Sequence, residues 1–174
     1  MQARMLKVAR VLGVVSRISL WISATGLVLM TAFIAWQVFG RFVLNNSPTW
    51  TEPASLLLMG WFIFLGAAVG IREGYHLSFD VLLYVIPLKA KSVLRTVSDL
   101  VVAGFGFGMA WYGADLAMKT WDSTMPSLGL PDGVSLIALS CGGVLIVVFS
   151  TERIARRMAG LPTAHFGETE LPKD

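Results

Sequence analysis

The sequence predicts an all-α integral membrane protein with four transmembrane helices and with both termini in the cytoplasm. The first observation is composition: apolar residues make up 55% of the 174 residues and charged residues 14%, against roughly 45–50% and about 25% in soluble domains. The mean hydropathy is +0.69. The other two observations are four long uncharged runs and an alternating distribution of Lys and Arg. We expect lipid to be the solvent for much of the chain.

The uncharged runs justify the four spans in order. The first run extends from Ile18 to Phe39 and the second from Ala54 to Ile71, behind a proline in the first turn. The third is uncharged over 100–114, and the fourth runs from Gly133 to Ser150. At 1.5 Å per residue, an 18-residue helix covers about 27 Å, close to the hydrocarbon thickness.

With their flanks, the spans are expected in one four-helix membrane domain, 1–157, followed by a flexible cytoplasmic tail, 158–174. The expected span boundaries are 16–40, 54–72, 95–117 and 133–152. Short interfacial helices are predicted at residues 4–12, which mix basic and apolar side chains, and at 77–86, which are apolar but too short to span. The N-terminus lacks a cleavage site before a polar segment, which favours an uncleaved signal anchor over a signal peptide.

The Lys and Arg residues set the orientation. They number four before the first span, one after it, four before the third span, one after it, and four after the fourth span. Short loops rich in Lys and Arg stay cytoplasmic. Both termini are therefore predicted inside, and an even number of spans requires them to lie on the same side.

Several chemistries are excluded by the residues available. Asp99 and Asp115 lie sixteen positions apart, about 24 Å along a helix. We expect two solvated helix-end carboxylates; a proton relay is the alternative. Neither His76 nor His165 lies in a span, and Cys141 is the single cysteine, so we expect no haem, metal or other cofactor. No nucleophile has a base beside it. The sequence predicts neither an enzyme nor a nucleic-acid partner.

Glycines cluster in three of the spans, at 66–70, 104–108 and 142–143. Small residues let helix backbones approach closely in lipid. They indicate either internal packing of the four helices or a face that docks a partner.

The most informative segment runs from Arg41 to Asp80. Arg41 and Glu52 bracket a short hairpin and are able to pair there, while positions 72, 76 and 80 are four apart and would share one face of a continuous helix. Gly74 is a candidate break in that helix. The alternative for each of these residues is a solvated interfacial charge. The residues singled out here are Arg41, Trp50, Glu52, Trp61, Arg72, His76 and Asp80.

This segment resembles the DctQ-type small membrane subunit of tripartite ATP-independent periplasmic (TRAP) transporters. The shared features are the arginine that closes the first span, Trp-x-Glu at the entrance to the second, Trp and Leu-Gly-Ala-Ala within it, and Arg-x3-His-x3-Asp after it. Four spans, inside termini and a later Leu-Gly-Leu-Pro at 128–131 are similar as well. Pro53 is a departure, because the family often has a second acidic residue there.

The resemblance implies an accessory subunit in the bacterial inner membrane. The expected partners are a large multi-span transport subunit, a periplasmic substrate-binding protein and membrane lipid. Transport would follow the sodium gradient and import organic anions such as C4-dicarboxylates or sialic acid. The residues singled out above would serve assembly and docking. The polar tail suggests that the large subunit is a separate chain. The alternatives are an autonomous small transporter or channel and a membrane anchor of another complex.

Overall fold

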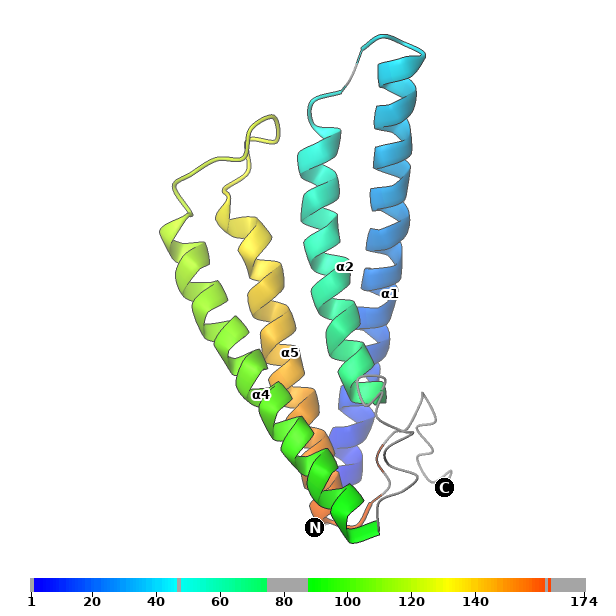
Figure 1. The fold of residues 1–174 in the computed structure, drawn as a ribbon, viewed down its shortest axis with the longest axis vertical. Helices are drawn as coiled ribbons and strands as arrows, with labels where there is room; N and C mark the ends of the chain where they lie inside the picture. The colour runs from blue at the N-terminus through cyan, green and yellow to red at the C-terminus, as the bar shows by residue number, and fades with distance from the viewer. Residues whose placement is uncertain (1, 47, 75–87, 162, 164–174) are drawn as a thin grey trace.

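The computed structural model describes residues 2–46, 48–74, 88–161 and 163 (Figure 1). Within these residues there are four helices, each long and apolar enough to cross a membrane. The part of the chain that it describes contains no strand, although one isolated β-bridge joins Thr124 to Pro131. The predicted all-α membrane protein with four spans is confirmed, and every expected span lies within one of these helices, which are α1 (Gln2–Phe42), α2 (Thr51–Glu73), α4 (Leu88–Lys119) and α5 (Gly133–Met158).

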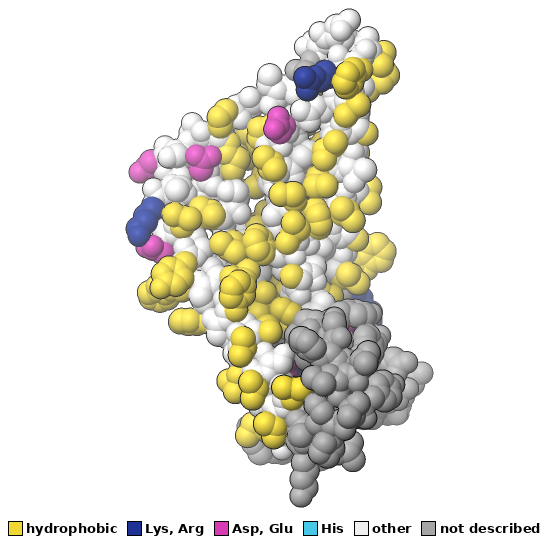
Figure 2. Space-filling model, viewed as in Figure 1, with side chains coloured by type: hydrophobic (Ala, Val, Ile, Leu, Met, Phe, Trp, Pro, Cys, Tyr) yellow, Lys and Arg dark blue, Asp and Glu magenta, His cyan; other side chains and the backbone are white. Residues whose placement is uncertain are grey.

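The helices form two hairpins, α1–α2 and α4–α5, that join through α2 and α5. The packing order is therefore α1, α2, α5, α4, and α1 and α4 are the outermost helices. Hydrophobic side chains run along the length of the helices on the face shown in Figure 2. We call the end that contains Arg72 and Arg153 the charged end, and the end with the connections 43–50 and 120–132 the loop end.

The N-terminal segment differs from the prediction. Residues 4–12 are helical, but they are the first turns of α1 and not a separate interfacial helix. With 41 residues, α1 is about 60 Å long, twice the hydrocarbon thickness of about 30 Å. No proline or glycine cap interrupts it, so the helix continues through its basic first turns. The second predicted interfacial helix, 77–86, lies outside the described residues.

Close packing joins α5 to both of its neighbours. Ala68, Ile146 and Phe149 are buried at the centre. A Cβ on Gly142 would lie 2.5 Å from the Cβ of Phe64, and one on Gly143 would lie 2.7 Å from the carbonyl oxygen of Gly106. These glycines serve internal packing, where van der Waals contact holds helices together in lipid.

Three serines place α1 against α2. Ser16, Ser19 and Ser23 are buried on one stripe of α1. Ser23 donates a hydrogen bond of 2.6 Å to the carbonyl oxygen of Phe62. Such small polar residues allow close approach of two helices and connect them inside the membrane.

Candidate functional site

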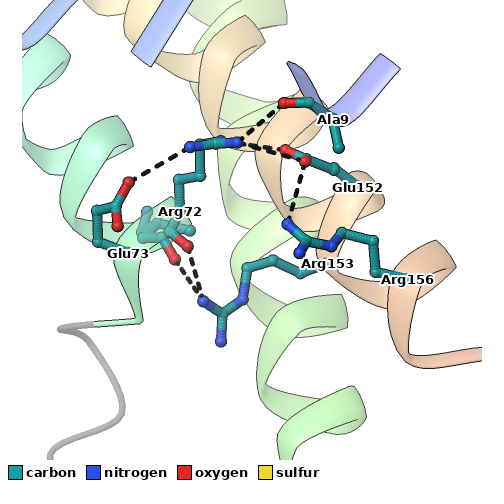
Figure 3. A network of polar contacts seen from close by, with 7 residues as sticks. Ala9, Arg72, Glu73, Glu152, Arg153 and Arg156 are labelled. Carbon is teal, nitrogen blue, oxygen red and sulfur yellow. Dashed lines mark hydrogen bonds and ion pairs between the residues drawn. The ribbon is translucent and has the colours of Figure 1, made fainter. Parts of the chain in front are cut away.

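Arg72, in the last turn of α2, is buried at the charged end, with its side chain 7% exposed. Its Nε donates to Glu152 Oε2 of α5 at 3.2 Å, and its Nη2 donates to the Ala9 carbonyl oxygen of α1 at 3.3 Å (Figure 3). Its Nη1 pairs with Glu73 at 3.3 Å. One guanidinium therefore connects three helices, because its donors point in fixed directions.

Arg153 of α5 makes a second set of connections. Its Nη1 donates to the carbonyl oxygens of Ile71 at 3.1 Å and Arg72 at 2.9 Å. Its Nε pairs with Asp99 Oδ1 of α4 at 3.3 Å. The last carbonyl groups of a helix have no partner within that helix. Arg153 thus satisfies the C-terminus of α2 and links it to α4.

Asp99 is fully buried, so the prediction of a solvated helix-end carboxylate at this position is wrong. Its Oδ2 accepts a bond of 2.7 Å from Arg157, which also donates to Thr96 at 3.0 Å. Burial is possible because two guanidinium groups replace the water that an isolated carboxylate would need. Asp115, in contrast, forms an exposed pair with Lys119 at 2.6 Å and is a solvated helix-end carboxylate, as predicted.

These residues form what we call the buried charge network. Arg156 completes it by pairing with Glu152 at 3.6 Å. Through side chains and the carbonyl of Ala9 the network touches all four helices. Buried charges are stable only when paired and hydrogen-bonded, so the geometry fixes the four helix ends relative to one another. Its charged members are Arg72, Glu73, Asp99, Glu152, Arg153, Arg156 and Arg157.

Sequence reasoning identified Arg72 but missed the rest of this network. A usable signal was present: Asp99 interrupts an apolar helical run, and Glu152 precedes three arginines within one and a half turns. Because α4 and α5 are antiparallel neighbours, those positions reach the same depth. An acidic residue and a basic group at equal depth on adjacent spans predict an ion pair.

At the loop end, Arg41, Trp50 and Glu52 flank the α1–α2 connection. The Trp50 ring packs edge-on against Phe33 with centroids 5.4 Å apart. Arg41 and Glu52 are both exposed, and no ion pair joins these two described side chains. The structure therefore brings Trp50 onto α1 and leaves the two charges directed toward solvent or a partner.

Backbone contacts order both loop-end connections. Gly40 faces the carbonyl oxygen of Asn46, where an added Cβ would lie 2.8 Å away, and Thr51 Oγ1 donates to the carbonyl oxygen of Pro48 at 2.8 Å. In the second connection, the amide of Met125 donates to Leu130 at 2.8 Å. Hydrogen bonds and close backbone contacts therefore shape the described parts of both connections.

Trp61 lies away from both ends, in an apolar groove between α1 and α2. Arg72 lies in the last turn of α2, which ends at Gly74 with a φ of 83°. His76 and Asp80 lie outside the described residues. Among the residues described, no group of His, Cys, Asp and Glu is arranged to hold a metal ion.

Comparison with known proteins places this architecture in a family. Residues 30–160 match the model for "Tripartite ATP-independent periplasmic transporters, DctQ component". The chain belongs to the DctQ family. Its matched region covers the last third of α1, all of α2, α4 and α5, and both loop-end connections.

Individual DctQ relatives are distant but match most of the chain. A Haemophilus influenzae protein described as a TRAP transporter small permease is 26% identical over 136 residues, 74% of this chain and 80% of its own length. The sialic acid TRAP transporter small permease SiaQ of Vibrio cholerae is 25% identical over 74% of this chain and 75% of its own. The ectoine TRAP transporter small permease TeaB of Halomonas elongata is 25% identical over 67% of this chain and 62% of its own length.

Membership also fixes the location. DctQ proteins are components of periplasmic transporters, and this chain crosses the membrane with apolar α-helices. Spanning proteins of the bacterial outer membrane are closed β-barrels. This DctQ protein is therefore a multi-pass protein of the bacterial inner membrane.

Proposed function

We propose that this DctQ protein is the accessory subunit of a sodium-coupled importer. A large multi-span subunit would hold the sodium and substrate sites, and a periplasmic binding protein would deliver the substrate. The relatives are named for sialic acid and ectoine and for C4-dicarboxylates. All these compounds carry a carboxylate, so a small organic acid is the proposed substrate. The chain itself would be no enzyme.

The observation that carries this proposal is the buried charge network. It connects the ends of all four helices, and most of its charged members are buried, with Asp99 at 0% and Arg153 at 3% exposed. A carrier that moved substrate between these helices would have to break paired, buried charges in each cycle, which costs several kcal/mol. A fixed arrangement instead suits a brace against which a larger subunit moves.

The proposed orientation places the charged end in the cytoplasm. The described chain has Lys7, Arg10 and Arg17 in the first half of α1 and the arginines of the buried charge network at that end. The loop end has Arg41 and Lys119. The positive-inside rule favours cytoplasmic placement of the more basic side. The loop end would then face the periplasm and the binding protein.

The family-motif residues receive separate roles in this proposal. Arg41, Trp50 and Glu52 would shape the periplasmic surface on which the binding protein or large subunit docks. Trp61 would support assembly in the membrane. Arg72 would act through the buried charge network, and His76 and Asp80 would continue the connection at the cytoplasmic side.

Purification of the tagged chain from its native membrane in mild detergent tests the proposal. Mass spectrometry should recover a much larger multi-span protein with it. Glu52→Ala should weaken that recovery or substrate uptake while leaving substrate selectivity unchanged, and Asp115→Ala, which removes an exposed carboxylate of α4 outside both connections, serves as the matched variant. Recovery of the chain alone as a homo-oligomer that transports a solute would overturn the proposal in favour of an autonomous transporter.

A further inference from the structure

An open apolar groove lies between α1 and α2 on the membrane-spanning part of the α1–α2 hairpin. Its volume is about 360 Å³, and its lining is formed by Trp21, Ile22, Thr25, Gly26, Leu29, Leu58 and Trp61. The α1 part of the lining extends over eight residue steps, about 12 Å along the helix. Thr25 supplies the hydroxyl group of an otherwise apolar surface.

Small residues bring α1 and α2 close together beside the groove. Ser23 and Gly26 permit the approach, because even a Cβ added to Gly26 would lie only 3.6 Å from the Cβ of Phe62. The large rings of Trp21 and Trp61 line the groove. Trp21 is 70% exposed, so the groove opens toward the surroundings of the helix and not toward the interior.

Basic residues precede the groove on the same stripe of α1. Positions 7, 14 and 21 are seven apart, and positions 10 and 17 interleave with them at spacings of three and four, so all five lie along one side of the helix. Lys7, Arg10 and Arg17 are exposed. Arg17 lies four residues before Trp21, about 6 Å, and its long side chain can extend toward the charged end as basic residues near an interface do.

Lys7 and Arg17 form no ion pair or hydrogen bond with any residue that the structure describes. They are thus available to an external anion at the boundary of the membrane. The basic side chains lie directly before the apolar groove along α1. Such a surface complements an amphiphile whose anionic group is followed by a hydrocarbon chain.

We propose that this surface binds one anionic phospholipid, with its phosphate between Lys7 and Arg17 and one acyl chain in the α1–α2 groove. The lipid would come from the leaflet on the side of the charged end. Basic residues near a membrane contribute roughly fivefold each to the affinity for anionic lipid, and buried methylene groups add to the binding. The inference does not depend on the proposed transport role.

Native mass spectrometry of the purified full chain tests it, after equilibration with equal amounts of phosphatidylglycerol and phosphatidylcholine of the same acyl composition. Wild type should retain one phosphatidylglycerol in preference to phosphatidylcholine. Combined Lys7→Gln and Arg17→Gln should reduce the preference about 25-fold, the product of two fivefold effects. Lys119→Gln, which removes an exposed charge at the loop end, should leave the preference unchanged.

The groove is tested by a second, independent pair of variants. Thr25→Trp fills the groove from an exposed position and should lower retention of both lipids, whereas Val101→Trp on the exposed face of α4 (67% exposed) should not. Equal retention of the two lipids by wild type, or unchanged retention by Thr25→Trp, would overturn the proposal. So would cross-linking from position 25 to a protein partner in native membranes, because the groove would then hold a helix.

Discussion

Replacing Asp99 with Asn tests whether the buried charge network holds the four helices together. The variant keeps the shape of the side chain but removes the charge that faces Arg153 at 3.3 Å and Arg157 at 2.7 Å. The Asp99 side chain is 0% exposed, so water does not replace the lost interaction. Removing one partner of a buried ion pair costs about 3–5 kcal/mol, and we expect a loss of this size in the free energy of unfolding.

Asp115→Asn is the matched control, because it removes the same charge from the same helix. The Asp115 and Lys119 side chains are 45% and 67% exposed, and exposed pairs contribute about 0.2–1 kcal/mol. Unfolding by SDS in mixed micelles measures both variants against wild type. If Asp99→Asn unfolds at the same SDS fraction as Asp115→Asn, the network does not stabilise the fold. Asp99→Asn and Arg157→Gln should also be less than additive, because both break one contact.

Three further predictions concern packing, docking and orientation. Gly143→Ala should destabilise the fold by about 1–3 kcal/mol in the same SDS titration, because the added Cβ would lie 2.6 Å from a backbone nitrogen of α4, while Gly108→Ala meets nothing within 4 Å and should be neutral. Glu52→Gln should lower uptake by about two- to fivefold, because one exposed ion pair with a docking partner contributes up to about 1 kcal/mol. The order of substrate preference should stay the same, and a changed order would contradict a role in docking. In a Cys141→Ser background expressed in intact cells, Asn45→Cys should react with a membrane-impermeant maleimide and Met158→Cys should not. The reverse labelling would invert the proposed orientation.

The sequence was sufficient for the four spans because hydropathy depends on each helix by itself. Buried charges are different, since their stability depends on which side chains other helices bring to the same depth. Asp99 therefore looked like a solvated helix end until α5 placed Arg153 and Arg157 against it. The end of α2 could be predicted from the sequence, because glycine readily adopts the positive φ observed at Gly74.

Among the site residues, too, features that depend on one segment could be predicted, and features that depend on contacts between segments could not. Trp50 was identified from its neighbours in the sequence, and its contact with Phe33 follows from the short connection between α1 and α2. For Arg41 and Glu52 the sequence left both an ion pair and a solvated charge open, because a spacing compatible with an ion pair does not position both side chains. The groove at Trp61 depends on the separation of two helices, which no pattern within one helix gives.

The two hairpins end at different heights. Gly26 of α1 packs at the level of Leu58 and Phe62, and Gly60 of α2 packs at the level of Ser135 and Ala138. Beyond this shared level, α1 continues to Phe42 while α5 begins at Gly133, a difference of about 18 Å along the helices. The 120–132 connection rises above the ends of α4 and α5 but does not reach the end of the α1–α2 hairpin, so the loop end has a lower surface, which we call the floor, and a higher one, which we call the wall (Figure 1). A protein that settled on the floor would meet the wall sideways, so two surfaces at an angle would set both its position and its rotation about the membrane normal.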